Sequence, residues 1–141
     1  MTVIPQHIAK LMSPEDRKAF GKGAMTAEEA LARAEVKNER ELQKQIVALL
    51  RLKGIEPIVS RMDKRTSNNV GTPDILFAVQ ATCEGSEWRE PIAWECKFAK
   101  GALSIDQQRM AVRMSTPPNG WTVKTITSVD EAIQELKELE L

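Results

Sequence analysis

A chain of 141 residues, 42% hydrophobic and 28% charged, is expected to form one soluble domain with a core of its own. Two cysteines and one histidine provide neither a disulfide framework nor zinc-ligand spacing, so we expect a reducing, cytoplasmic setting. The net charge is zero, and no stretch has the apolar length of a signal peptide or a membrane span, so we expect no membrane partner.

The first part of the chain is predicted to be helical. Residues 13–23 begin with serine, proline and two acids, which is typical of a helix start, and end in two glycines. Residues 26–34 open on a capping box, and residues 38–53 place leucine and isoleucine on one side of a longer helix. We therefore divide the chain into a helical extension over 1–37 and a core domain over 38–141.

The core domain is predicted to add strands and two more helices. The expected elements are a short strand at 56–60, a loop at 62–72, strands at 74–80 and 91–98 joined by a turn at 84–87, a helix over 104–115, a strand at 121–126 and a last helix from 128. This order predicts an α/β fold in which a mixed central sheet is flanked by helices.

Three charged residues are predicted to lie close together when strands 74–80 and 91–98 form a hairpin. Asp74 at the start of the first strand then lies opposite the end of the second strand, which carries Glu95 and Lys97. Because side chains alternate along a strand, Glu95 and Lys97 share one face, while Trp94, Cys96 and Phe98 point to the other. Two adjacent carboxylates repel each other, and Mg²⁺ or Mn²⁺ would remove that repulsion.

The alternative interpretation of Glu95 and Lys97 is a surface ion pair on an exposed hairpin. Three features argue against it. A glycine and a proline, Gly71 and Pro73, directly precede Asp74 at the start of an apolar strand, and apolar residues flank both charges of the second strand. Charges within a buried strand need ligands or each other. The sequence therefore predicts a metal site, with the charge of Lys97 beside the position of a phosphate or an attacking water.

With these residues in place, the chain resembles the PD-(D/E)xK nuclease superfamily, and most closely its virus-type replication-repair nuclease (VRR-NUC) family. The matching residues are, in chain order, Glu41, Gln45, Gly54, Arg61, Gly71-Thr72-Pro73-Asp74, Glu95-Cys96-Lys97, Lys100 to Ser104, Gln107, Gly120, the strand 121–126 and Ser128 to Glu131. Residues 1–37 lie outside the resemblance. The resemblance implies a restriction-endonuclease-like core and hydrolysis of DNA phosphodiester bonds with Mg²⁺ or Mn²⁺.

The resemblance also implies roles for individual residues. Asp74 and Glu95 would hold the metal together with the backbone carbonyl of Cys96, and Glu41 would add a carboxylate from its helix. Lys97 would orient the nucleophile, and Gln107 would face the site. Two of these residues have a simpler interpretation, since Gln107 also completes a capping box with Ser104 and Glu41 is also an ordinary exposed helix acid.

Basic residues surround this site in the sequence, whereas the last residues of the chain are mainly acidic. The candidate phosphate contacts are Arg61, Lys64, Arg65, Lys100 and Arg109. A run of charges is more often a solvated face, so these five are weaker predictions than the acid-acid-lysine set.

We expect an endonuclease acting on branched or structured DNA such as four-way junctions. The alternatives are a catalytically inactive nucleic-acid-binding module and a restriction-type or nicking endonuclease. We also expect a homodimer, because two symmetry-related sites match a substrate with two related strands. Apolar residues in 13–34 are a candidate dimer surface, and their packing on the protein's own sheet is the alternative.

Overall fold

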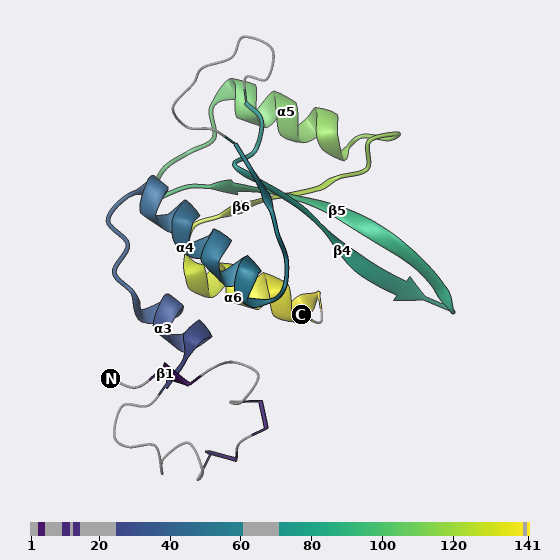
Figure 1. Ribbon diagram of the computed structural model, residues 1–141. Coiled ribbons are helices and arrows are strands. Elements are labelled where there is room, and N and C mark those ends of the chain that lie inside the picture. The colour runs from purple at the N-terminus through teal and green to yellow at the C-terminus, as the bar shows by residue number, and fades with distance from the viewer. Residues whose placement is uncertain (1–2, 5–9, 12, 15–24, 61–70, 140) are drawn as a thin grey trace.

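The computed structural model describes residues 3–4, 10–11, 13–14, 25–60, 71–139 and 141 (Figure 1). The predicted helix over 13–23 and the predicted loop over 62–72 therefore lie mostly outside the described residues. Within the described ranges, no helix is long and apolar enough to cross a membrane.

The architecture is a mixed four-stranded sheet between helices, as the sequence predicted. The sheet contains β3 (Ile58–Val59), β4 (Ile75–Cys83), β5 (Ser86–Cys96) and β6 (Thr122–Ile126), in the order β3-β4-β5-β6. β4 runs antiparallel to both β3 and β5, and β6 runs parallel to β5. The helices α4 (Glu39–Leu52) and α6 (Val129–Glu138) lie on one face, and α5 (Ile105–Ser115) lies on the other (Figure 1).

The N-terminal extension contributes α3 (Ala27–Arg33) and two short strands. These strands, β1 (Val3–Ile4) and β2 (Met25–Thr26), pair in parallel away from the main sheet. Thr26 and Glu29 form the predicted capping box of α3: the Thr26 side chain accepts from the Glu29 N–H, and the Glu29 carboxylate accepts from the Thr26 N–H. The β1–β2 pair was not predicted, because two-residue strands carry no periodic signal.

The hydrophobic core lies between the sheet and the α4–α6 layer. The predicted stripe of α4 forms one wall, and Leu42, Ile46, Leu49 and Leu50 are each at most 1% exposed. Alternate residues of β5 form the other wall, and the Trp94 ring meets the Phe77 ring edge to face at 4.9 Å. This pattern confirms the strand periodicity predicted for Trp94 and Cys96.

Phe98 departs from that periodicity. It was predicted to share the core face with Trp94 and Cys96, but it is 37% exposed. β5 ends at Cys96, and the backbone reverses direction at Ala99, whose φ is 56°. Strand alternation therefore no longer applies at residue 98.

The hairpin between β4 and β5 is longer and tighter than predicted. Its turn consists of Glu84 and Gly85 alone, with φ values of 51° and 82°, and Cys83 pairs with Ser86. Positive φ at both positions is characteristic of the two-residue turns that match strand twist. Ile75 consequently pairs with Trp94, a register two residues away from the one predicted with a turn over 84–87. This register brings Asp74 beside Glu95 rather than beside Lys97.

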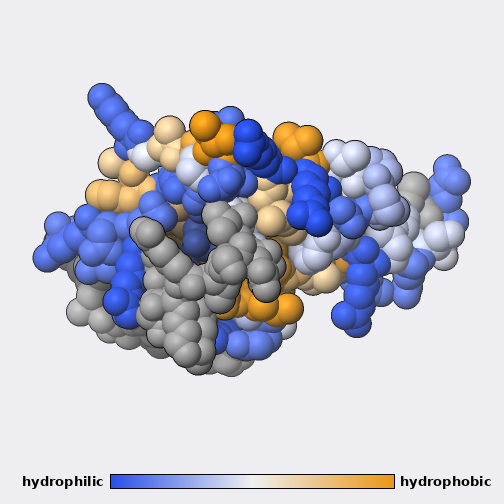
Figure 2. Space-filling view, turned by 90° about the horizontal axis from the view of Figure 1, so that it is seen from above, coloured by the Kyte–Doolittle hydropathy of each residue, from blue (hydrophilic) through white to orange (hydrophobic). Residues whose placement is uncertain are grey.

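The outer side of α5 is exposed to solvent. None of its residues is buried, and Ile105 and Val112 are each 66% exposed. The view onto this side shows hydrophobic side chains among hydrophilic ones (Figure 2). α5 thus covers the second face of the sheet only partly.

Candidate metal and catalytic site

Asp74 is held where β4 begins and β5 ends. Its carboxylate Oδ2 accepts a hydrogen bond of 2.8 Å from the Cys96 N–H. The backbone on both sides of Asp74 is anchored to Ser60, the residue after β3. The Ser60 N–H donates to the Asp74 carbonyl and the Ser60 Oγ donates to the Pro73 carbonyl, both at 2.8 Å. These bonds hold the Asp74 carboxylate against the end of the neighbouring strand.

Three carboxylates converge at this strand end. Oxygen atoms of Glu39, Asp74 and Glu95 all lie within 4.8 Å of one another. Glu39 is the first residue of α4, so the cluster combines one helix start with two strand ends. Such a set of oxygen atoms is of the kind that Mg²⁺ or Mn²⁺ prefers.

The helix contributes Glu39 to this cluster, whereas the sequence interpretation assigned Glu41. The Glu41 carboxylate instead accepts a 2.8 Å hydrogen bond from the Lys37 N–H. Residues two apart on a helix are separated by about 200° around its axis, so the two glutamates point in nearly opposite directions. Glu39 precedes Leu42 by three and Ile46 by seven, which places it on the buried stripe, and this spacing was the signal that could have identified it.

Glu95 is the most deeply buried of the three acids, with 4% of its surface exposed. Its Oε1 accepts a 2.7 Å hydrogen bond from Gln107 Nε2. Its Oε2 is buried and has no hydrogen-bond partner among the described residues. Burial, and then the nearby charge of Asp74, raise the pKa of Glu95 from 4.5 to about 8, against the opposing influence of Lys97.

Lys97 follows β5 and is 9% exposed. Its Nζ lies 3.8 Å from Glu95 Oε1 and 4.0 Å from Glu39 Oε1. These distances permit electrostatic attraction but are too long for good hydrogen bonds. The ammonium group therefore places a positive charge at the rim of the acidic cluster and retains N–H groups for a further acceptor.

Gln107 performs two functions through a single side chain. Its Oε1 accepts from the Ser104 N–H at 2.8 Å, and its backbone N–H donates to Ser104 Oγ at 3.2 Å, which completes the predicted capping box of α5. Because the amide oxygen is used by the cap, the NH₂ group points at Glu95. The two interpretations of Gln107 are thus compatible, and the cap itself aims the donor at the buried acid.

Gly71 fixes the distance between the segment before Asp74 and the start of α5. A Cβ atom added at Gly71 would lie 2.3 Å from the Asp106 carbonyl oxygen and 2.9 Å from the Gln107 N. The backbone also has a φ of +84° there, which favours glycine. Only glycine lets these two backbones approach closely enough for Gln107 to reach Glu95.

A divalent cation fits this group of residues. Oε2 of Glu95 is a buried acceptor without a donor among the described residues, and such an atom is costly unless it binds a cation or a proton. Glu39 and Asp74 supply two more carboxylates close to it. The Cys96 thiol is not suited to join them, because burial, followed by the charge of Asp74, raises its pKa far above its usual range. The predicted role of the Cys96 carbonyl stays a prediction.

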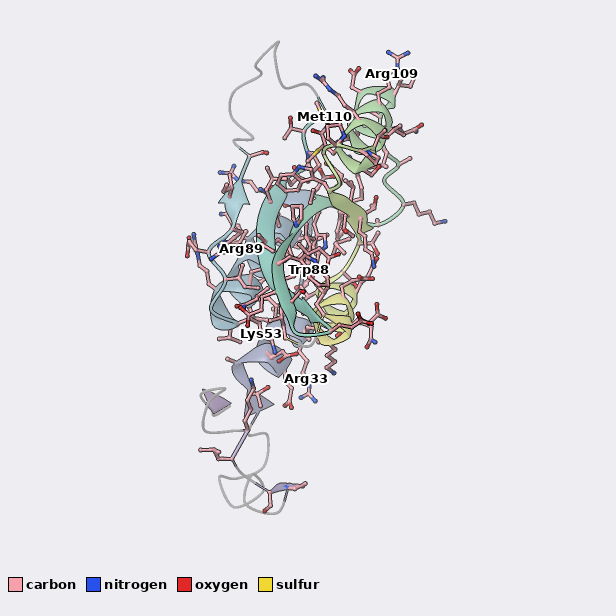
Figure 3. The ribbon with its side chains drawn as sticks, turned by 90° about the vertical axis from the view of Figure 1, so that its right-hand side faces the viewer. Arg33, Lys53, Trp88, Arg89, Arg109 and Met110 are labelled. Carbon is pink, nitrogen blue, oxygen red and sulfur yellow. The ribbon has the colours of Figure 1, made fainter. Side chains whose placement is uncertain are left out.

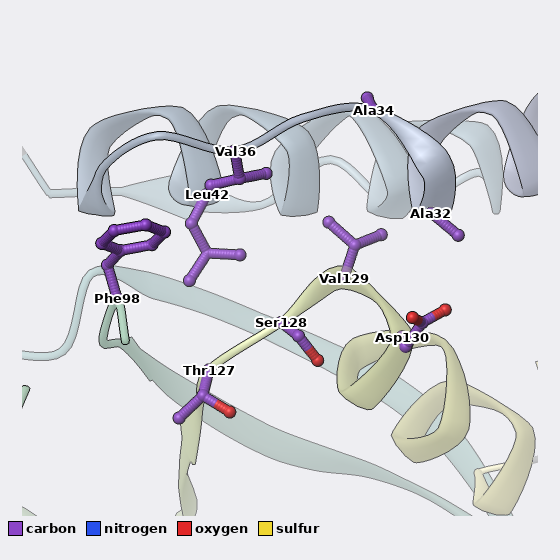
Figure 4. Close-up of a pocket in the computed structure, with 9 residues that line it drawn as sticks. All are labelled: Ala32, Ala34, Val36, Leu42, Phe98, Thr127, Ser128, Val129 and Asp130. Atoms are coloured by element: carbon purple, nitrogen blue, oxygen red, sulfur yellow. The ribbon is translucent and has the colours of Figure 1, made fainter. Parts of the chain in front are cut away.

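Two hollows lie near the cluster. One, of about 80 Å³, borders Glu95 and Gln107 on the α5 side of the sheet and has room for a few water molecules. The other, of about 230 Å³, lies between the end of α3 with the segment that joins it to α4 and the start of α6, beside Phe98 (Figure 4). Its lining is mainly apolar, with Asp130 as its one acidic member, so the first hollow is the one that belongs to the cluster.

The predicted phosphate contacts are divided between described and undescribed residues. Lys100 and Arg109 are exposed, and Arg109 points outward from α5, away from the sheet (Figure 3). Arg61, Lys64 and Arg65 lie outside the described residues. The structure therefore brings together Asp74, Glu95, Lys97 and Gln107, adds Glu39, and leaves Glu41 and Arg109 apart from the cluster.

Comparison with known proteins gives no further assignment. No protein-family model matches the chain, and no curated protein matches it.

Proposed function

We propose that this protein is a metal-dependent endonuclease of the PD-(D/E)xK type, with a restriction-endonuclease-like core and a resemblance to the VRR-NUC family. The observation that carries the proposal is the environment of Glu95. A carboxylate that is 4% exposed, with one unpartnered oxygen and two further acids beside it, is costly for stability, and a lysine stands at the rim. A purely structural strand end has no need of this arrangement.

In this proposal Glu39, Asp74 and Glu95 hold Mg²⁺ or Mn²⁺, with the carbonyl of Cys96 as a further predicted ligand. The bound ion supplies Lewis acidity toward a phosphate oxygen and lowers the pKa of its water. The Cys96 N–H fixes one oxygen of Asp74, and Gln107 Nε2 fixes one oxygen of Glu95, so both acids keep their orientation without reorganising.

Lys97 acts on the phosphate in this proposal. Its Nζ lies 3.8 Å from Glu95 Oε1 and 4.0 Å from Glu39 Oε1, too far for a tight hydrogen bond to either carboxylate. It donates to a non-bridging oxygen as negative charge develops there and orients the attacking water. A residue that acts on developing charge contributes more to turnover than to binding.

Branched or structured DNA, a homodimer and an intracellular location complete the proposal. A small single-domain chain has little surface for reading bases, which favours recognition of DNA shape over a restriction-type specificity. Two sites related by a two-fold axis would suit a junction, and light scattering with and without junction DNA measures this assembly.

The test is a panel of labelled DNA substrates, comprising duplex, flap, fork and four-way junction, incubated with Mg²⁺, Mn²⁺ or EDTA. Cleavage that needs the metal and is lost in Asp74→Asn supports the proposal. Metal-dependent binding without cleavage of any substrate would instead favour the inactive binding module. Cleavage that persists in EDTA would contradict the metal site itself.

A further inference from the structure

The basic side chains near α4 differ in whether they have acidic partners. Toward the end of the helix, Arg51 forms a two-pronged ion pair with Glu56, with N–O distances of 2.9 to 3.3 Å. Lys53, just past the helix, is paired with Glu28 at 2.9 Å. The charges at this end are therefore largely neutralised within the protein.

At the other end of α4, three exposed cations remain without such partners. Lys37, Arg40 and Lys44, which we name the basic strip, are all exposed, and none forms an ion pair with another described residue. This end of the helix is also the end that contributes Glu39 to the acidic cluster. These unpaired cations thus lie at the end of α4 that also contributes to the candidate site.

The strip has a defined geometry. Arg40 and Lys44 are four residues apart, so they share one side of the helix about 6 Å apart along its axis. The hydrogen bond from the Lys37 N–H to the Glu41 carboxylate holds Lys37, two residues before α4, against the first turn of the helix. Glu41, which is not in the cluster, accordingly helps to order the strip.

We propose that the basic strip binds the phosphate backbone of the DNA segment that flanks the scissile phosphate, an inference that rests on the proposed nuclease function. Arg40 and Lys44, about 6 Å apart along the helix axis, span a distance close to two phosphate steps of one strand, which carries a charge every ~3.4 Å of its axis. The strip lies on the exposed side of the same helical turns that carry Glu39, so a strand bound along it runs past the end of α4 that contributes to the cluster. It binds every sequence equally, because it contacts phosphates and not bases.

The two ends of α4 also differ in whether their basic side chains are paired with acids. On a solvated helix face, paired and unpaired charges would be distributed along the whole length. Here Arg51, near the end of the helix, is paired with Glu56, whereas the three cations of the basic strip have no such partner among the described residues.

The test compares full-length variants for binding to a fluorescently labelled DNA duplex of about two helical turns, in EDTA so that no cleavage occurs. One variant combines Lys37→Gln, Arg40→Gln and Lys44→Gln. The matched control is Arg51→Gln, which removes an exposed arginine of the same helix. Fluorescence anisotropy from about 50 to 200 mM salt gives the slope of log K against log salt for each protein.

The expected result is a slope less steep by about 0.9 for each lost contact, or about 8-fold weaker binding per contact at 0.1 M salt. The Arg51→Gln control should keep the wild-type slope. Equal slopes in the triple variant and the wild type would contradict the proposed phosphate contacts. An equal loss of DNA affinity in the Arg51→Gln control would also contradict them, because it would indicate a nonspecific effect of charge.

Two further measurements separate this inference from the nuclease proposal. Calorimetric titration with Mn²⁺ should be unchanged in the triple variant, because the strip lies outside the three-carboxylate cluster. If the wild type cuts DNA and the strip variant binds it normally, the strip is overturned and the nuclease proposal stands. If the wild type neither binds nor cuts DNA with Mn²⁺, both fail.

Discussion

Replacing Glu95 by glutamine should make metal-free protein more stable at high pH. Burial and the charge of Asp74 raise the pKa of Glu95 from 4.5 to about 8, so between these values the folded protein keeps a proton that the unfolded chain releases. The unfolded state then binds fewer protons, and the free energy of unfolding falls as the pH rises from about 5 to about 8. Glutamine keeps the acceptor for Gln107 and cannot ionise.

The size of the effect follows from the pKa difference. Each unit corresponds to ~1.4 kcal/mol, so the shift sets an upper limit of about 5 kcal/mol, reached above pH 8. For a chain of this length, that corresponds to a difference in Tm of at most about 15 to 20 °C. Near pH 5 the two proteins should have similar stability. Glu95 is then protonated in the folded protein, and a neutral carboxyl group destabilises the fold little.

Thermal melting of wild type and Glu95→Gln in EDTA, from pH 5 to pH 9, measures this difference. Glu87→Gln at the exposed hairpin serves as the control and should follow the wild type throughout. Saturating Mn²⁺ should raise the Tm of the wild type more at pH 8 than at pH 5.5, because the site binds the ion without a proton. Parallel profiles for wild type and Glu95→Gln would refute the reasoning.

Four other substitutions test the site. Lys97→Ala should lower the cleavage rate by about 10²- to 10³-fold in single-turnover assays while DNA affinity in EDTA changes little, and a rate equal to wild type would remove Lys97 from the mechanism. Glu39→Gln should weaken Mn²⁺ binding in calorimetry whereas Glu41→Gln should not, and the reverse result would restore the sequence-based assignment. Gln107→Glu keeps the helix cap yet sets a fourth carboxylate against the cluster, so metal-free Tm at pH 8 should fall, and an unchanged Tm would show that the amide does not face Glu95.

The secondary structure was largely predictable because local signals were strong. The helix over 38–53 had a clear apolar stripe, and the boxes at Thr26 and Ser104 marked helix starts that the structure confirms. The hairpin register was wrong by two residues, because a polar stretch over 84–87 does not reveal which two residues take positive φ. The β1–β2 pair gave no signal at all.

The site was predictable where it depended on strand alternation. Glu95 and Lys97 could be placed together from their spacing, and Asp74 opposite them from the hairpin. Glu41 was assigned from the family resemblance, whereas helix geometry places Glu39 on the side of Leu42 and Ile46. The double role of Gln107 was beyond the sequence, because it depends on which end of the amide the cap uses.

The β4–β5 hairpin has a consequence for the protein's behaviour at high concentration. Residues 78–83 and 86–91 pair only with each other among the described strands, so a two-stranded ribbon projects from the domain with two unpaired edges (Figure 1). Such edges are templates for intermolecular strand addition. Glu84, Glu87 and Glu90 give its outer part like charges that repel a second copy, whereas Trp88 is 47% exposed and attractive to one. The ribbon therefore influences the colloidal stability of the protein, although it lies at the opposite end of the hairpin from the candidate site. Acidic residues at the ribbon tip are the ones to preserve when the protein is engineered.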